Sequence, residues 1–382
     1  MHTSRIRSLD LVRGAACVLM AIDHVRVYSG LPAGGPSPAI FFTRWITHFV
    51  APTFCLLAGT GAYLLGRRLN DSRALAKFLA TRGLLLVVLE LTVIRFLWSF
   101  NPNLSAFSLA GVIWMLGWCM LLLAACVRLP ARIVGLSGVA IVLLQQLFSL
   151  VPRVLPEPAR TGFNAVWAFI YPSGSDALFG VNVLYVLVPW IGVMMAGYGF
   201  GVIMARDDDT RRRTVLRIGL GMTGAFFLFA TALTIATRGR GTDGDIAPFW
   251  MQMLNQQKYP ASQLFLLMTL GPMITLLAAV DGARGWWSRA LVTFGRVPMF
   301  YYLAHILVIH VAALLVNVIR TGSAHGEWYL TAPYTSVPAD QRWSLGLLYL
   351  VVAIVVAGVL YPACQWYAGV KARHPGGWMQ YL

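Results

Sequence analysis

The chain has 382 residues, of which 58% are hydrophobic and 12% are charged, and its mean hydropathy is +0.69. A soluble globular chain carries about 25% charged residues, so this composition excludes a soluble fold of this size and favours a membrane protein. The net charge of +16 does not indicate nucleic-acid binding, because the Lys and Arg residues lie between apolar runs and form no basic patch. We therefore expect no nucleic-acid partner.

Ten apolar stretches follow one another with short polar gaps, and each is long enough to cross about 30 Å of hydrocarbon as a helix. We predict an all-α polytopic bundle that forms a single membrane domain over residues 1–382. The predicted spans are 8–28, 43–66, 75–99, 107–126, 132–151, 181–204, 214–237, 262–281, 294–319 and 345–369. A further apolar segment, 162–171, is too short to cross alone, and we expect it at the membrane interface or as a dip that returns.

Basic residues are concentrated in alternate connections between the predicted spans. They occur at 67–68 after the second span, at 211–213 after the sixth and at 371–373 in the tail, whereas the connection 29–42 contains no Lys or Arg. Lys and Arg accumulate on the cytoplasmic side of membrane proteins. The pattern therefore predicts a multi-pass protein of a bacterial inner membrane with both termini in the cytoplasm.

The cysteines give no sign of a metal site or of disulfides. All five lie within apolar runs and none has CxxC spacing, so we expect them to pack in the core. The chain also lacks an HExxH motif. We predict no metal.

Ionisable side chains within the predicted spans are the main candidates for function, because each is costly at membrane depth unless it is paired or faces water. They are Asp10, Arg13, Asp23 and His24 in the first span, Arg44 and His48 at the second, Glu90 and Arg95 in the third, and Arg296, His305 and His310 in the ninth. With the N-terminus inside, the four histidines lie at mid to outer depth. A neutral imidazole there can take a proton from a weak nucleophile and return it later.

Several of these residues also have a structural interpretation. Asp10 and Arg13 are three positions apart and can form an ion pair within one helix. An intramembrane histidine such as His305 can simply bond to a neighbouring helix. Asp23 cannot share a helix face with the adjacent His24, so we expect it to pair with another helix, and Arg26 and Arg44 are the candidate partners.

The segment 7–14 reads Arg-Ser-Leu-Asp-Leu-Val-Arg-Gly, and His24 follows ten residues after its glycine. This pattern resembles the first helix of transmembrane acyltransferases, which include heparan-alpha-glucosaminide N-acetyltransferase and the acyltransferase-three family of O-acyltransferases. In the latter family a proposed catalytic histidine stands at the position of His24.

Three further blocks, at 41–59, 258–262 and 294–310, extend the resemblance over most of the chain. Together they are similar to bacterial proteins of unknown function that are related to the catalytic domain of the heparan enzyme. That enzyme has an Asn where His24 falls, and its catalytic histidine precedes the second helix, where loop 29–42 contains none. The resemblance therefore leaves His24 and His48 open as the base.

The resemblance implies transfer of an acyl group, most simply acetyl, from cytoplasmic acetyl-CoA or another acyl-CoA to a sugar or other envelope acceptor at the outer side. The implied catalytic residues are His24, His48 and Asp23, with Asp23 or His48 orienting His24. The residues expected to bind CoA phosphates are Arg13, Arg82 and Arg296, although ordinary positive-inside placement also explains them. The residues expected to bind the acceptor are Arg44, Lys258, Tyr302, His305 and His310.

The expected partners are the lipid bilayer, the acyl-CoA and the acceptor, and a homodimer is left open. The alternative function is a transporter or flippase that moves a small polar or lipid-linked substrate without acyl chemistry. The sequence has no evident internal repeat, which weakens the alternative. An enzyme should lose activity with a single imidazole, whereas a transporter should work without CoA.

Overall fold

The computed structural model describes residues 6–34, 37–103, 107–174, 176–237 and 247–373. The chain divides into two compact units. We call Ala51–Glu90 with Ser108–Asp281 the middle unit, and Arg5–Val50 with Leu91–Phe107 and Gly282–Leu382 the terminal unit. The terminal unit is thus built from both ends of the chain. That residues 1–382 act as one membrane domain stays a prediction.

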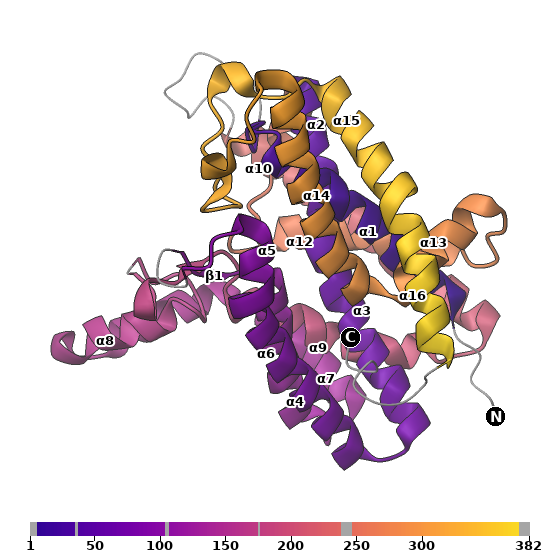
Figure 1. The fold of residues 1–382 in the computed structure, drawn as a ribbon. Helices are drawn as coiled ribbons and strands as arrows, with labels where there is room; N and C mark the ends of the chain where they lie inside the picture. The colour runs from indigo at the N-terminus through magenta and orange to yellow at the C-terminus, as the bar shows by residue number, and fades with distance from the viewer. Residues whose placement is uncertain (1–5, 35–36, 104–106, 175, 238–246, 374–382) are drawn as a thin grey trace. The chain divides into compact units, whose positions relative to one another are not determined.

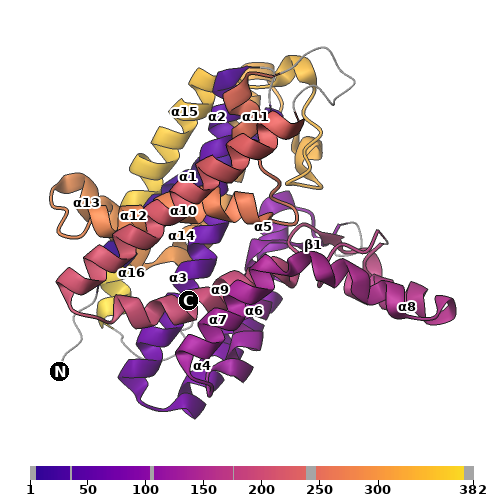
Figure 2. The same cartoon turned by 180° about the vertical axis from the view of Figure 1, so that it is seen from behind.

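The middle unit consists of helices that associate mainly in pairs. Its longer helices are α3 (Val50–Leu69), α4 (Ser72–Leu89), α6 (Val112–Cys126), α7 (Ala131–Leu143), α9 (Leu187–Met204), α10 (Asp208–Thr237) and α12 (Gln263–Ala279). The closest pairs are α4 with α6, α7 with α9, and α10 with α12 (Figure 2). Small residues allow this approach in the membrane. A Cβ added at Gly83 of α4 would lie 2.6 Å from the carbonyl oxygen of Gly117 in α6.

Shorter elements connect the helices of the middle unit. They are η3 (Gln145–Val154), α8 (Glu157–Trp167), η4 (Leu178–Gly180), α11 (Phe249–Leu254), and the strands β1 (Leu109–Ala110) and β2 (Asn182–Val183). The two strands pair in parallel just before α6 and α9. The Glu90 carboxylate lies at the start of α6, where it accepts hydrogen bonds from the backbone N–H groups of Ile113 at 2.9 Å and Trp114 at 3.1 Å. It thereby satisfies two donors that a helix N-terminus leaves without an intrahelical partner.

The terminal unit is built around α1. Its elements are α1 (Arg7–Tyr28), α2 (Pro38–Trp45), η1 (Ile46–Phe49), α5 (Arg95–Ser99), α13 (Trp286–Arg296), α14 (Pro298–Thr321), η5 (Gly326–Tyr329), η6 (Ala339–Gln341), α15 (Leu345–Ala353), η7 (Ile354–Leu360) and α16 (Tyr361–Arg373). Along the chain, the boundary between the two units falls within η2 (Glu90–Ile94). In the terminal unit α1 packs against α13, α14 and α15 (Figure 1).

Two glycines bring α1 and α13 into backbone contact. A Cβ at Gly14 would lie 1.8 Å from the carbonyl oxygen of Leu291, and a Cβ at Gly295 would lie 1.8 Å from that of Asp10. Arg13 links the two helices at this crossing, because its Nη1 lies 3.2 Å from both the Asp10 carboxylate of α1 and the Gly295 carbonyl of α13. The sequence blocks at 7–14 and 294–310 therefore meet at one helix crossing.

The helical prediction is confirmed, since each of the ten predicted ranges contains helix. Among the described residues five segments are long and apolar enough to cross a membrane, and a sixth qualifies if the bent pair α7 and η3 forms one span. The five are Pro38–Leu69, Leu187–Met204, Asp208–Thr237, Pro298–Thr321 and Leu345–Arg373. Two further apolar helices, α6 and α12, are shorter than these.

Several predicted helices differ from the observed ones in their boundaries. The range 294–319 breaks at Val297, whose φ of −131° and ψ of 50° are not helical, because the following Pro298 disfavours the α conformation there. The range 132–151 bends by 71° at Leu144. The helix expected from 181 begins at Leu187, and the short segment expected at 162–171 forms α8 five residues earlier.

Candidate active site

The terminal unit brings His24 of α1 against His305 of α14. His24 Nδ1 lies 2.6 Å from His305 Nε2, and the two rings stack with centroids 4.8 Å apart and planes 20° apart. His305 is fully buried, whereas His24 is half-buried. Both residues were expected at mid to outer depth, and the structure makes them a hydrogen-bonded pair.

The hydrogen bonds around this pair define which nitrogens carry protons. His305 Nδ1 lies 3.0 Å from the backbone oxygen of Tyr301, and a carbonyl can only accept. With both imidazoles neutral, His305 therefore donates from Nδ1 and carries its lone pair on Nε2. His24 must then donate from Nδ1 to that lone pair, which leaves its own lone pair on Nε2. This tautomer makes His24 Nε2 the basic atom of the pair.

Aromatic rings surround the His24 imidazole. The Trp98 ring of α5 meets it edge-on at 4.6 Å between centroids, and the Tyr302 ring lies 6.3 Å away. The Tyr302 ring also meets the His305 ring edge-on, with 5.3 Å between the ring centroids. The sequence analysis selected Tyr302 but missed Trp98. The only signal for Trp98 was an aromatic residue three positions after the intramembrane Arg95.

The neighbours of His24 in sequence have other contacts. Asp23 pairs with Arg26, one of the two candidate partners, with 3.1 Å between Oδ1 and Nη2. The expectation of a pair between helices was wrong, because the two residues are three positions apart on α1. His48 is buried in η1, which packs against α1. The residue that the structure places at His24 Nδ1 is His305, rather than Asp23 or His48. A catalytic role for Asp23 and for His48 stays a prediction.

His310 belongs to a second aromatic cluster, one turn and a half further along α14. Its Nδ1 donates to the backbone oxygen of Leu97 at 3.0 Å, and its ring stacks on Phe100 at 3.8 Å between centroids. The Tyr28 ring lies 4.9 Å away, and the Tyr28 hydroxyl donates to the Trp98 backbone oxygen at 2.5 Å. These contacts give His310 a structural role, while acceptor binding by it stays a prediction.

The other two residues predicted to bind the acceptor, Arg44 and Lys258, have contacts with residues other than His24 and His305. Arg44 of α2 donates to the backbone oxygen of Ala33 at 2.9 Å and so holds the loop after α1. Lys258 lies in the middle unit, where its buried ammonium faces the rings of Tyr185 at 5.9 Å and Tyr259 at 5.2 Å. Acceptor binding by Arg44 and Lys258 stays a prediction.

The three arginines expected to bind CoA phosphates differ in their surroundings. Arg13 is held by Asp10 and the Gly295 carbonyl. Arg82 is half-buried on α4 of the middle unit. Arg296 lines a cavity of about 370 Å³ in the terminal unit, together with Arg7 and Arg289, which the sequence analysis did not select. Arg7 opens the 7–14 segment and Arg289 lies outside the sequence blocks, but neither was selected, because an arginine at a membrane boundary resembles any positive-inside residue.

No group of three or more His, Cys, Asp or Glu side chains that could hold a metal ion occurs among the residues described here. The cysteines Cys17, Cys55, Cys119 and Cys364 are buried as free thiols, and Cys126 is half-buried. The absence of a metal from the reaction stays a prediction.

Sequence comparison relates the part of the chain that contains His24 to a known protein family. Residues 5–235 match the family described as heparan-alpha-glucosaminide N-acetyltransferase, catalytic. This match covers more than half of the chain and includes His24 and His48, but ends before the helix that carries His305. No curated protein matches the chain. The family implies transmembrane acetyl transfer from an acetyl-CoA type of donor. Because the match extends over most of its length, the chain belongs to the heparan-alpha-glucosaminide N-acetyltransferase catalytic family.

Proposed function

We propose that this protein is an acyl-CoA-dependent acyltransferase in which His24 is the general base and His305 its positioning residue. The acyl group, most simply acetyl, comes from a cytoplasmic acyl-CoA. A hydroxyl or amine of a sugar or another envelope component receives it at the outer side of a bacterial inner membrane, with both termini of the chain in the cytoplasm. The observation that carries the proposal is the hydrogen bond from His24 to His305.

The tautomer of His24 suits this chemistry. Its Nε2 lone pair takes the proton of the acceptor O–H or N–H as the acceptor attacks the thioester carbonyl carbon. The C–S bond then breaks with its electron pair on sulfur, and His24 returns the proton to that sulfur to release CoA. A thioester is already activated, so the step needs a base for the acceptor more than it needs a covalent intermediate. His305 holds the imidazole in the productive orientation, as the orienting member of a catalytic triad does.

The sequence predicts that α1 crosses the bilayer, although α1 is not among the five candidate spans of the structure, and on that prediction the position of His24 supports transfer across the membrane. Arg7 and His24 are 17 positions apart on one helix, which corresponds to about 25 Å at 1.5 Å per residue. The hydrocarbon layer is about 30 Å thick. A donor whose charged part stays near Arg7 would therefore have to extend its acyl end most of the way across the membrane to reach His24.

The test is acyl transfer by the purified full chain in liposomes, with radiolabelled acetyl-CoA and a panel of sugars and amines. We expect His24→Ala to lower the transfer rate by about 100-fold or more, since general base catalysis contributes about 10² to 10⁴. The matched control is His325→Ala, which removes a half-buried imidazole that pairs with the exposed Glu327 in the loop after α14. His325→Ala should keep the full rate.

Two outcomes would contradict the proposal. His24→Ala that retains both the wild-type rate and the wild-type unfolding temperature would exclude His24 as the base. Substrate uptake into liposomes that continues without any CoA thioester and without acyl transfer would instead establish the transporter or flippase.

A further inference from the structure

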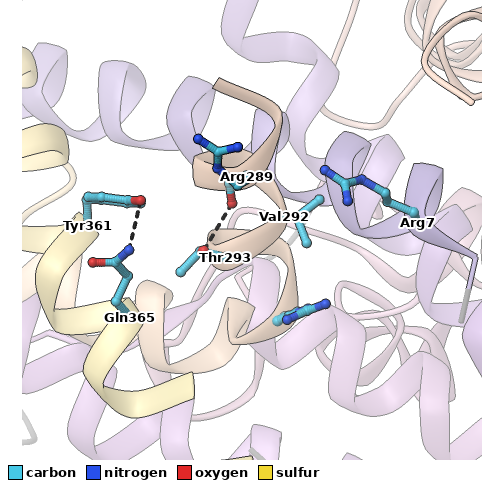
Figure 3. A pocket seen from close by; sticks show the side chains of 7 residues that line it. Arg7, Arg289, Val292, Thr293, Tyr361 and Gln365 are labelled. Carbon is cyan, nitrogen blue, oxygen red and sulfur yellow. Dashed lines mark hydrogen bonds between the residues drawn. The ribbon is translucent and has the colours of Figure 1, made fainter. Parts of the chain in front are cut away.

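The cavity beside α13 has a strongly basic lining. Arg7 of α1 lies on one side, Arg289, Thr293 and Arg296 come from α13, and Tyr361 and Gln365 of α16 lie on the other side (Figure 3). All six residues belong to the terminal unit. The volume of about 370 Å³ falls within the range of about 300–1,000 Å³ typical of ligand pockets.

Within the part of the chain that the structure describes, the three guanidinium groups of this pocket have no counter-ion. Other arginines of the chain pair with carboxylates, as Arg26 does with Asp23 and Arg211 with Asp281. Among the described residues none of the three pocket arginines has a carboxylate within ion-pair distance, and no Asp or Glu lines the pocket. Three cations that converge without an anion favour an anionic ligand.

The donors of the pocket are suited to phosphate. Arginine binds phosphate with two parallel N–H···O bonds, which a lysine cannot do. The Arg7 guanidinium is oriented by a bond of 2.9 Å to the Ser288 hydroxyl, which holds it towards α13. Across the pocket the Gln365 amide donates to the Tyr361 hydroxyl at 2.8 Å, so that hydroxyl keeps its own proton for a ligand oxygen.

Large exposed aromatic side chains on the same two helices indicate the membrane–water interface. Trp286 at the start of α13 is 76% exposed, and Trp366, next to Gln365 on α16, is 63% exposed. Tryptophan is enriched at the level of the lipid headgroups. Basic pockets between helices at this level bind the phosphate of anionic lipids.

We propose that the pocket lined by Arg7, Arg289 and Arg296 is a phosphate-binding site at the membrane interface. Two molecules at that interface carry the required group, namely an anionic phospholipid through its headgroup and CoA through its nucleotide phosphates. The site does not depend on acyl transfer, so a failure of the His24 experiment leaves it standing. With a phospholipid it would anchor α13 and α16 to the membrane surface, and with CoA it would hold the charged end of the donor.

The experiment measures binding to the full chain in an uncharged maltoside detergent, with two kinds of probe. One arm titrates short-chain phosphatidylglycerol against phosphatidylcholine, and the other titrates CoA against CoA that lacks its 3′-phosphate. The variants are Arg289→Gln, Arg296→Gln and the double variant. The matched control is Arg284→Gln, which removes an exposed arginine just before α13 that does not line the pocket.

We expect saturable binding in one arm that each single variant weakens about tenfold and that Arg284→Gln leaves unchanged. Preference for phosphatidylglycerol identifies a lipid site, and preference for CoA with its 3′-phosphate identifies a donor site. Arg296→Lys should restore binding only in part, because it keeps the charge but loses the bidentate geometry. No saturable binding in either arm, or binding that the double variant does not weaken, would overturn the proposal. Unfolding temperatures without ligand show whether each variant remains folded.

Discussion

At the level of single residues, His305 contributes to the candidate site without being accessible itself. It is fully buried, and it accepts from His24 while donating to the Tyr301 carbonyl. A proton acceptor can be oriented in this way by a neighbour that never touches substrate. Substitutions of His305 that keep a side chain of similar size can therefore test its positioning role separately from the role of His24 as the base.

We predict that His305→Phe keeps the ring stack on His24 but removes the acceptor for its Nδ1 proton. The turnover rate should fall on the order of 10²-fold, while the KM for acyl-CoA stays within about twofold of wild type. His305→Gln should recover part of the rate, because its side-chain oxygen can accept from His24. Steady-state kinetics on both variants checks this. An equal loss in Phe and Gln variants would indicate a packing role only.

A second prediction concerns Glu90, which the sequence analysis selected together with Arg95 as ionisable residues of the third predicted span. The structure gives the two residues different partners. Glu90 bonds to the start of α6, and Arg95 donates to backbone oxygens that include those of Asn101 and Phe107. Glu90→Ala should lower the free energy of unfolding by about 1–3 kcal/mol, because it leaves two buried N–H groups without an acceptor. Glu90→Gln keeps one oxygen there and should cost less. Thermal unfolding in detergent measures both, and equal effects would contradict the capping role.

The sequence predicted single residues well where the cause was local. Asp10 and Arg13 are three positions apart, so helix geometry alone brings them together as predicted. Asp23 was expected to pair with another helix, but the same spacing pairs it with Arg26 on α1. The contact between His24 and His305 spans 281 positions. It depends on how two distant helices are rotated, which one sequence does not specify. Arg7 and Arg289 escaped selection because only the tertiary structure shows that they share a cavity.

At the level of elements, the close backbone contact between α1 and α13 predicts the effect of a single glycine substitution on stability. Gly14→Ala would place a methyl group 1.8 Å from the Leu291 carbonyl oxygen, a distance that requires the helices to separate. We expect a loss of stability of more than about 3 kcal/mol, or no folded protein. The matched control is Gly221→Ala in α10, where the added methyl meets nothing within 4 Å. The control should be neutral or stabilising by as much as about 1 kcal/mol.

The unfolding temperature and the yield of monodisperse protein report both glycine variants. A Gly14→Ala protein as stable as wild type would show that α1 and α13 are not in backbone contact.

The sequence predicted where the helices lie, because long apolar stretches mark them, but it did not predict where the helices break. Pro298 was visible as a break signal, whereas the bend at Leu144 has no proline or glycine next to it.

At the level of the whole molecule, the predicted topology can be tested with two exposed serines. Ser72 begins α4 in the basic second connection, and Ser323 lies in the loop after α14. We introduce Ser72→Cys or Ser323→Cys into a chain whose five cysteines are replaced by alanine. Alternating basic loops place Ser72 in the cytoplasm and Ser323 outside. A membrane-impermeant maleimide applied to intact cells should label only Ser323→Cys, and labelling of Ser72→Cys alone would reverse the orientation.

The division of the terminal unit between the two ends of the chain has a consequence for biosynthesis. The ribosome completes α1 long before it makes α14, and at about 5–20 residues per second the 281 positions between His24 and His305 take roughly 15–60 s to translate. During that interval the nascent α1 carries Asp10, Arg13, Asp23 and Arg26 without α13 or α14 beside it. These charges are then balanced only by the pairs within the helix, Asp10 with Arg13 and Asp23 with Arg26, and α1 stays without its tertiary partners until the last quarter of the protein is made.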